Sequence, residues 1–258
     1  MIVSKSMIKY LSSLKMKKYR EEYGQFIAEG DKIVRDTLQN QTIDINTLIA
    51  TDEWLAANST LTKKVKYIYN ANPSDLDRIS TFETSPPVII LLDIPHITPD
   101  FTEIEHTFSL ALDNIQDPGN LGTIIRTADW FGIRNVFCSP LCADLYNPKV
   151  IQSSMGAVFN IKVHYSEFEE LFKQLSSNKD YTIAGTFMKG DLVSELKGTK
   201  NGIIVFGNES QGIKGSYTVY IKKQVTIPAG KPERIHVESL NVASSVAATL
   251  ALISDTNI

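Results

Sequence analysis

The side chains best suited to group-transfer chemistry lie in residues 114–132, where an apolar run ends on a polar loop that opens a helix. Active sites of open α/β sheets form at such strand ends. Pro118 and Gly119 predict a tight turn, and Asn120 is in position to cap the helix that follows. Arg126 lies six residues beyond Asn120, inside that helix. Taken alone, this segment is as typical of a capped crossover helix with a solvated arginine as it is of an active site.

Two later segments place polar residues at strand ends in the same way. In the first, Glu209 lies between two glycines after the apolar run 202–206. It either orients a neighbouring donor or cation, or is the exposed acid of a glycine-rich turn. In the second, Ser239 and Asn241 begin the last helix, where they either cap it or present hydrogen bonds outward. Neither segment contains a dinucleotide fingerprint or a phosphate-binding loop.

The elements that must position these residues form an α/β pattern. Before residue 93, expected strands at 26–28, 47–50 and 66–69 alternate with helices near 30–40 and 73–81. Later strands are expected at 110–112, 135–138, 182–185, 202–206 and 224–227, with helices near 120–131, 166–176 and 239–253. This alternation predicts a largely parallel sheet covered on both faces. Turn formers in 93–108 predict a linker, and we expect domains at 1–98 and 107–258.

Composition sets limits on the class of protein. The chain has 258 residues, 43% of them hydrophobic, and no apolar run long enough to span a membrane. Its start lacks the apolar core of a secretory signal, so we expect a cytoplasmic protein. The spacing of Cys138 and Cys142 fits neither a disulfide framework nor a zinc site, and the four histidines are dispersed. We therefore expect reduced thiols and no metal.

The charge is unevenly distributed. The net charge is −3, yet residues 1–20 contain six cationic side chains and no acid. Such a segment either neutralises nucleic-acid phosphates or forms a solvated lysine-rich helix face. The six residues are Lys5, Lys9, Lys15, Lys17, Lys18 and Arg20.

Taken together, the three polar segments resemble the SpoU (TrmH-type) branch of the SPOUT RNA methyltransferases. The first motif of the resemblance consists of Asn114, Asp117, Pro118, Asn120, Gly122, Arg126, Phe131 and Gly132. The second comprises residues 206–209 with Gly212, and the third residues 227–228 with 239–242. The resemblance covers the whole chain, since residues 17–30 are similar to the N-terminal substrate-binding domain of the family.

The resemblance implies an S-adenosylmethionine-dependent 2′-O-ribose methyltransferase acting on structured rRNA or tRNA. It also implies a homodimer, a ribosomal-protein-like first domain and a C-terminal trefoil knot, a threading that no periodicity predicts. The implied catalytic residues are Asn120, Arg126, Glu209, Ser239 and Asn241. The implied cofactor residues are Thr186, Gly207, Ile227, Ala229 and Leu240. The implied RNA contacts are Lys17, Lys18 and Arg20.

Several questions stay open at the level of sequence. An arginine stays protonated at neutral pH, so Arg126 is either an unusual base or a clamp on the phosphate beside the target ribose. The segment 229–238 is longer than in many family members, and Lys231, Arg234 and His236 either contact RNA or are solvated. The alternatives to the methyltransferase are an inactive RNA-binding protein that retains the fold, and an unrelated α/β enzyme with a nucleotide cofactor.

Overall fold

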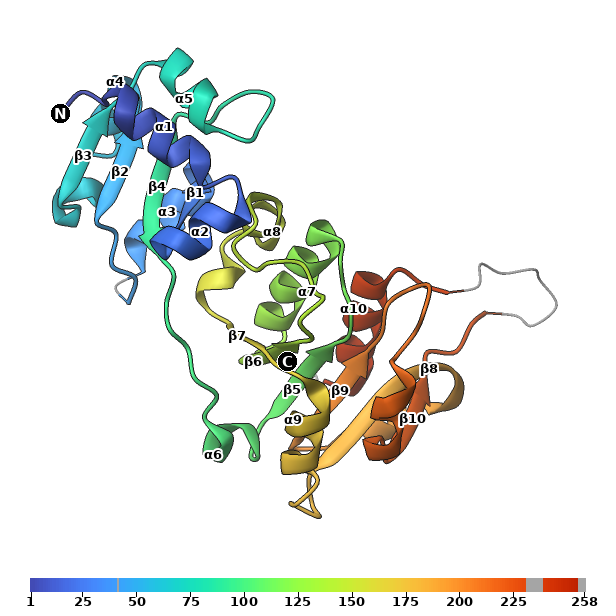
Figure 1. Ribbon diagram of the computed structural model, residues 1–258. Coiled ribbons are helices and arrows are strands. Elements are labelled where there is room, and N and C mark those ends of the chain that lie inside the picture. The colour runs from blue at the N-terminus through green and yellow to red at the C-terminus, as the bar shows by residue number, and fades with distance from the viewer. Residues whose placement is uncertain (41, 231–238, 255–258) are drawn as a thin grey trace. The chain divides into compact units, whose positions relative to one another are not determined.

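A computed structural model describes residues 1–40, 42–230 and 239–254, which form two compact units (Figure 1). The first unit contains residues 1–96 together with 144–159, and the second contains 97–143 and 160–258. Segment 144–159 thus packs with the first unit, although it lies within the span that we assigned to the second domain. The expected domain boundary itself stays a prediction.

The first unit is built on a four-stranded sheet in the order β1-β4-β2-β3. Strand β4 (Val88–Asp93) runs antiparallel to β1 (Gln25–Glu29) and β2 (Thr47–Ala50), whereas β2 and β3 (Tyr67–Asn70) are parallel. The three strands expected from the sequence are confirmed. The apolar run that precedes the linker adds a fourth strand, β4.

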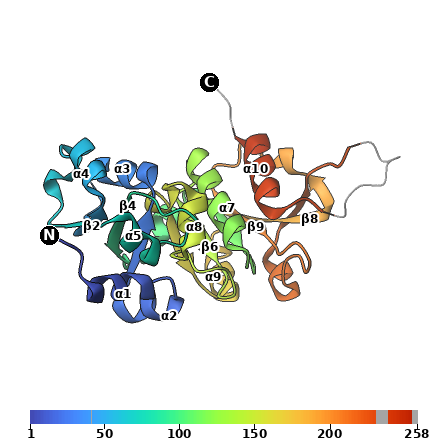
Figure 2. The ribbon, with the colours of Figure 1, turned by 90° about the horizontal axis from the view of Figure 1, so that it is seen from above.

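Helices cover both faces of this sheet. Helices α1 (Lys5–Ser13) and α5 (Pro73–Ile79) bury Ile8, Leu11 and Leu76 against Ile27 and Ile89. The N-termini of these two helices are capped by the side chains of Ser4 and Asn72. Figure 2 shows α1 and α2 (Lys17–Tyr23) on the opposite side of the sheet from α3 (Asp31–Gln39) and α4 (Asp52–Ala57). A short 3₁₀ helix, η1 (Leu61–Lys64), and α8 (Pro148–Ser154) also belong to this unit.

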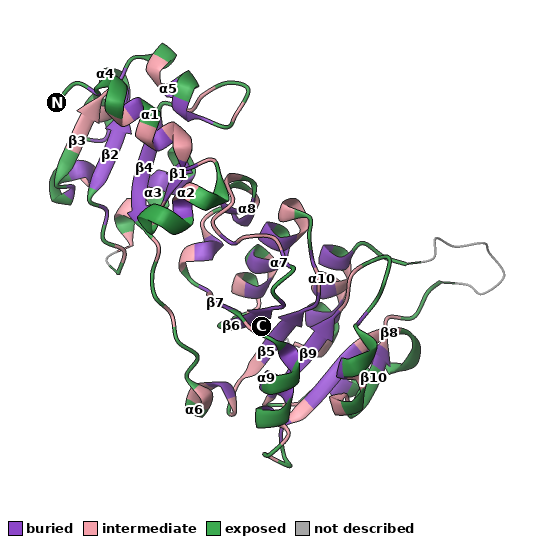
Figure 3. Cartoon of the chain, in the orientation of Figure 1, coloured by how far each residue is buried: buried purple, intermediate pink, exposed green. Residues whose placement is uncertain are grey.

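The second unit contains a six-stranded sheet in the order β10-β8-β9-β5-β6-β7. Every neighbouring pair is parallel, which confirms the predicted sheet type. The central strand β9 is buried along its whole length (Figure 3), as strands with both faces covered are. The six strands are β5 (Phe108–Leu112), β6 (Asn135–Cys138), β7 (Lys162–Tyr165), β8 (Thr182–Leu192), β9 (Gly202–Phe206) and β10 (Lys223–Thr226).

One face of the second sheet is covered by α9 (Phe168–Leu175), whose Phe168 and Phe172 pack with Phe137 and Val205. On the other side (Figure 2), α10 (Val242–Ile253) packs against α7 (Pro118–Trp130). The remaining elements are α6 (Phe101–Ile104), η2 (Ala157–Phe159), η3 (Val193–Leu196) and η4 (Gly215–Tyr220), of which η2 lies in the first unit. The described helices include none that is both long enough and apolar enough to cross a bilayer.

Candidate active site

The first polar segment opens α7 differently from the way we expected. Asp117 is the N-cap, because its side chain accepts a hydrogen bond from the backbone N–H of Asn120 at 2.8 Å. Pro118 takes the first helical position, which suits proline because a backbone N–H at that position would have no partner within the helix. The prediction that Asn120 caps the helix is therefore wrong. Asn120 lies in the first turn, where its side-chain amide is left to bind elsewhere.

That amide joins residues from all three polar segments. The Asn120 Nδ2 donates to Glu209 Oε1 at 2.9 Å, and the Asn241 Nδ2 donates to Asn120 Oδ1 at 2.9 Å. The Asn241 Nδ2 also approaches Glu209 Oε1, at 3.4 Å, as does the Val242 backbone N–H. One carboxylate oxygen thus organises two amides and the start of α10. A negative charge at a helix N-terminus is itself favourable.

Asn241 performs both of the functions between which the sequence left a choice. Its Oδ1 caps α10, accepting from the backbone N–H groups of Ala243 at 3.0 Å and Ser244 at 3.3 Å. Its Nδ2 faces Asn120 and Glu209. Because capping α10 already fixes the side chain of Asn241, holding its amide toward Asn120 and Glu209 costs no further conformational entropy.

The loop between Phe206 and Ile213 is closed tightly. Asn208 and Gly212 exchange two backbone hydrogen bonds, at 2.8 and 3.2 Å. A Cβ on Gly207 would lie 2.2 Å from the backbone carbon of Gly212, a distance that a real side chain does not reach. Glycine is therefore required at this position, and the closed loop sets the direction of Glu209.

Four supporting residues, Asp113, Asn114, Ser139 and Asn208, were not among the predicted site residues. Asn114 has a φ of 59°, and its backbone N–H donates to Ser139 Oγ at 2.8 Å. The Asn208 Nδ2 donates to the Asn114 carbonyl at 3.0 Å, and the Asp113 carboxylate accepts from the Lys214 backbone N–H at 2.8 Å. These contacts tie the first polar loop to the second. Asn114 and Asn208 belong to the motifs quoted above, whereas nothing in the sequence pattern marked Ser139.

The other two implied catalytic residues are not part of the network. Arg126 is exposed on α7, and its guanidinium makes no hydrogen bond or ion pair to any described residue. Ser239 is exposed just before α10. The structure brings together Asn120, Glu209 and Asn241, and leaves Arg126 available to a group from outside.

Of the five implied cofactor residues, one lies within β8, three follow β9 and β10, the neighbours of β8 in the sheet, and Leu240 precedes α10. Thr186 is near the β8–β9 pairing, where its Oγ1 donates to the Val205 carbonyl at 3.2 Å. Gly207 follows β9, whereas Ile227 and Ala229 follow β10. Leu240 is 48% exposed, so about half of this large apolar residue is left accessible by the described residues. Apolar side chains and loop backbone, with no cationic side chain among the five, fit a cofactor that has no phosphate.

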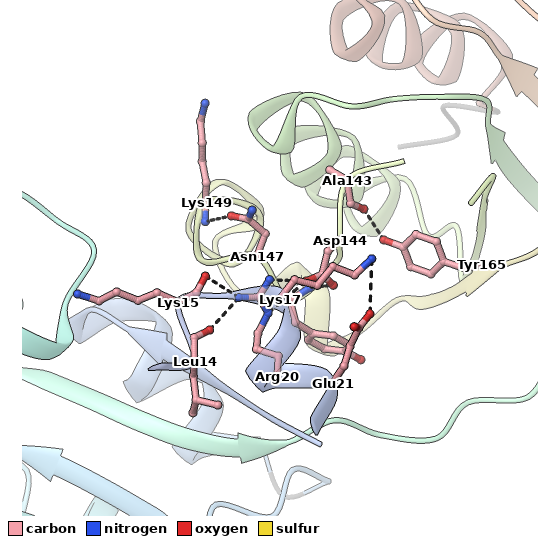
Figure 4. Close-up of polar contacts among 11 residues, drawn as sticks. Leu14, Lys15, Lys17, Arg20, Glu21, Ala143, Asp144, Asn147, Lys149 and Tyr165 are labelled. Carbon is pink, nitrogen blue, oxygen red and sulfur yellow. Dashed lines mark hydrogen bonds and ion pairs between the residues drawn. The ribbon is translucent and has the colours of Figure 1, made fainter. Parts of the chain in front are cut away.

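The three implied RNA contacts differ from one another in exposure. Lys17 and Lys18 are exposed on α2. Arg20 is 2% exposed, and its guanidinium donates to the carbonyls of Leu14 and Lys15, both at 2.8 Å, and to the Asp144 carboxylate (Figure 4). All the contacts of Arg20 lie inside the first unit, so its donors are already satisfied there.

Two further expectations concern metals and the insertion. Within 1–40, 42–230 and 239–254, no three His, Cys, Asp or Glu side chains gather where they would hold a metal ion. Cys138 and Cys142 are buried free thiols. Lys231, Arg234 and His236 lie outside the described residues.

Comparison with known proteins matches most of the chain to two family models. A model of the SpoU rRNA Methylase family matches residues 107–251, and a model of an MRM3-like substrate binding domain matches residues 5–89. The chain is 25% identical over 240 residues to the Bacillus subtilis 23S rRNA guanosine 2′-O-methyltransferase RlmP, covering 93% of this chain and 92% of that protein.

Two solved structures resemble the whole chain. A putative RNA methyltransferase of the TrmH family from Porphyromonas gingivalis is 33% identical, with a TM-score of 0.85 and 98% of both chains covered. An AdoMet-bound rRNA methyltransferase from Sinorhizobium meliloti is 25% identical, with a TM-score of 0.80, covering 98% of this chain and 96% of that one.

Proposed function

Because this chain belongs to the SpoU rRNA methylase family, we propose that it methylates the 2′-hydroxyl of a ribose in structured rRNA or tRNA, with S-adenosylmethionine as the methyl donor. The observation that supports this most directly is the hydrogen-bonded set of Asn120, Glu209 and Asn241. It assembles, from three segments far apart in the sequence, polar residues that the family motifs contain. S-adenosylmethionine supplies an electrophilic methyl group when bound.

The protein's contribution to this reaction is chiefly to position the acceptor. Holding the reacting groups in line removes much of the entropic cost of transfer. We assign Asn120 and Asn241, fixed by Glu209, to the ribose and its neighbouring phosphate. We assign Gly207, Ile227, Ala229, Leu240 and Thr186 to the cofactor, and Ser239 to the RNA side of the site.

The exposure of the Arg126 guanidinium favours a role as a clamp on the RNA phosphate over a role as the base that accepts the hydroxyl proton. The guanidinium has no partner among the described residues, and its planar fork matches two phosphate oxygens. A guanidinium bound to the adjacent phosphate fixes the ribose hydroxyl, and water or the phosphate accepts the proton. In this assignment the charge of Arg126 acts on RNA and not on the cofactor.

The proposal includes a homodimer in the cytoplasm. Trp130, at the end of α7, is 84% exposed, and indole rings are enriched in protein interfaces. We assign this side chain to the contact with a second copy. Sedimentation of the intact protein and of Trp130→Ala tests that assignment, since a monomeric intact protein contradicts it.

The activity is tested by incubating the protein with methyl-labelled S-adenosylmethionine and separated rRNA and tRNA pools, followed by mapping of 2′-O-methyl sites. We expect label in one pool and at one site. An RNA with 2′-deoxyribose at that site should accept no label. Cofactor binding without transfer to either pool would favour the inactive RNA-binding alternative, and absence of cofactor binding would exclude the methyltransferase.

A further inference from the structure

The first unit contains a cavity that none of the assignments above uses. It has a volume of about 670 Å³ and lies along α1, extending to the start of α2 and the last turn of α5. We call it the α1 groove. Its lining residues are Lys5, Ile8, Lys9, Ser12, Ser13, Met16, Tyr19 and Arg78.

The charged residues that line the α1 groove are all cationic. Lys5 and Lys9 lie one helical turn apart on the same face of α1, and Arg78 lies in the last turn of α5. All three are exposed, and none makes an ion pair with a described acid. The lining includes no Asp or Glu. Three unpaired cations around one hollow favour an extended anion over a neutral or cationic ligand.

The walls of the α1 groove are held together by hydrogen bonds. Ser12 Oγ and Lys15 Nζ both donate to the Arg78 carbonyl, at 3.0 and 3.2 Å. These bonds fix the last turn of α5 against α1, and the buried Ile8 packs in the core below. The cationic side chains therefore project from a rigid base.

One end of the α1 groove is aromatic. The Tyr19 ring stacks on Tyr23, with centroids 6.0 Å apart and planes inclined by 14°. Met16, which is 59% exposed, lies beside it in the lining. Nucleobases stack on accessible aromatic rings of this kind in proteins that bind single-stranded nucleic acid.

We propose that the α1 groove binds an unpaired segment of the RNA substrate, with phosphates on Lys5, Lys9 and Arg78 and one base on Tyr19. The proposal rests on RNA being the substrate. It places an RNA contact on residues other than Lys17, Lys18 and Arg20. An unpaired strand is required because a base inside a duplex cannot reach the ring.

The test measures binding of the full-length protein to a short fluorescein-labelled single-stranded RNA, and to the same strand annealed to its complement, by anisotropy without cofactor. We expect the double variant Lys5→Gln/Lys9→Gln to bind the single strand about tenfold more weakly and to reduce the slope of log K against log salt by about 1.4. Lys63→Gln/Lys64→Gln is the matched control, since it removes two exposed, unpaired charges from η1 in the same unit. It should bind almost as the intact protein does.

The aromatic contact is tested separately. We expect Tyr19→Leu to weaken single-strand binding by about tenfold and duplex binding little, whereas Tyr19→Phe retains the intact affinity because the stacking surface remains. The proposal would be overturned if the two double lysine variants lost affinity for the single strand equally, or if Tyr19→Leu bound the single strand as the intact protein does. Because this measurement needs no methyl transfer, failure of the α1 groove and failure of the proposed activity give different results.

Discussion

The side-chain amide of Asn120 donates to Glu209 Oε1 at 2.9 Å across 89 residues of sequence. The carboxylate also lies at the N-terminus of α10, 3.4 Å from the Val242 backbone nitrogen. Hydrogen bonds to an ionised acceptor are roughly twice as strong as neutral ones, so this carboxylate is the centre of the network.

Replacing Glu209 by Gln should therefore lower kcat for methyl transfer by about ten- to a hundredfold, because Asn120 and Asn241 lose their charged acceptor. We expect cofactor affinity and the thermal midpoint to change little. Steady-state kinetics on the identified RNA, with kcat and KM determined separately, measure the effect. Glu195→Gln, an exposed acid on η3, is the control. A rise in KM alone would show that Glu209 contributes only to binding.

Arg126→Ala should abolish transfer while calorimetric affinity for S-adenosylmethionine remains nearly intact. If the guanidinium clamps a phosphate, Arg126→Lys should retain part of the activity, since it keeps the charge but not the bidentate contact. Loss of cofactor binding in the alanine variant, or turnover equal to that of the intact protein, would contradict the assignment.

Gly207→Ala should distort the loop before Gly212 and cost about 1–3 kcal/mol of stability, because the new Cβ meets backbone that cannot move aside. We expect a large loss of cofactor affinity as well, measured by calorimetry. Gly215→Ala is the matched control, since a Cβ there meets nothing within 4 Å. Similar behaviour of the two variants would show that close packing at Gly207 is unimportant.

Arg20→Gln should destabilise the first unit by about 3–5 kcal/mol, because it leaves the Asp144 carboxylate and two carbonyls without a cationic partner. Lys17→Gln removes a comparable charge from an exposed pair with Glu21 and should change stability little. Denaturant midpoints of the two variants measure the difference. If Arg20→Gln instead weakens RNA binding at full stability, Arg20 is the RNA contact that the family resemblance implies.

His164 should make the second unit acid-sensitive. Burial, and secondarily the charge of Lys162, lowers the pKa of this histidine from 6.5, while Glu103 opposes the shift. His164 therefore binds a proton more readily in the unfolded chain than in the folded protein. Its neutral form contributes fully to the free energy of unfolding above about pH 6.5, and this contribution is lost as the pH falls below that value. His164→Gln, which retains a donor toward Asn135 Oδ1, should flatten this loss. Denaturant midpoints at mildly acidic and neutral pH compare the two proteins, and parallel curves would contradict the prediction.

The parallel sheet of the second unit follows from the alternation of apolar runs and helical segments. Strand β7 was not predicted, because Lys162 and His164 make a short edge strand look like a polar loop. The cap of α7 was assigned to Asn120, since Asp117 and Asn120 are equally suitable cap residues by type. Only the three-dimensional pairing with Glu209 distinguishes them.

The site was only partly predictable for a related reason. Asn120, Glu209 and Asn241 lie in motifs that mark them, whereas their mutual hydrogen bonds depend on strand order, which local sequence does not specify. The burial of Arg20 was hidden because Asp144 lies 124 residues away. The sequence of a basic segment does not indicate which of its cationic side chains is buried.

Segment 144–159 has a practical consequence for working with this chain. The first unit is discontinuous, and the partly buried Tyr146 and Phe159 pack against the buried Phe26, with ring centroids 4.5 and 6.4 Å away. A fragment that ends at residue 96 would expose this aromatic cluster and leave a buried guanidinium without its carboxylate. Gene truncation at the linker is therefore a poor route to an isolated substrate-binding half, and a fragment to which 144–159 is joined again is the better design.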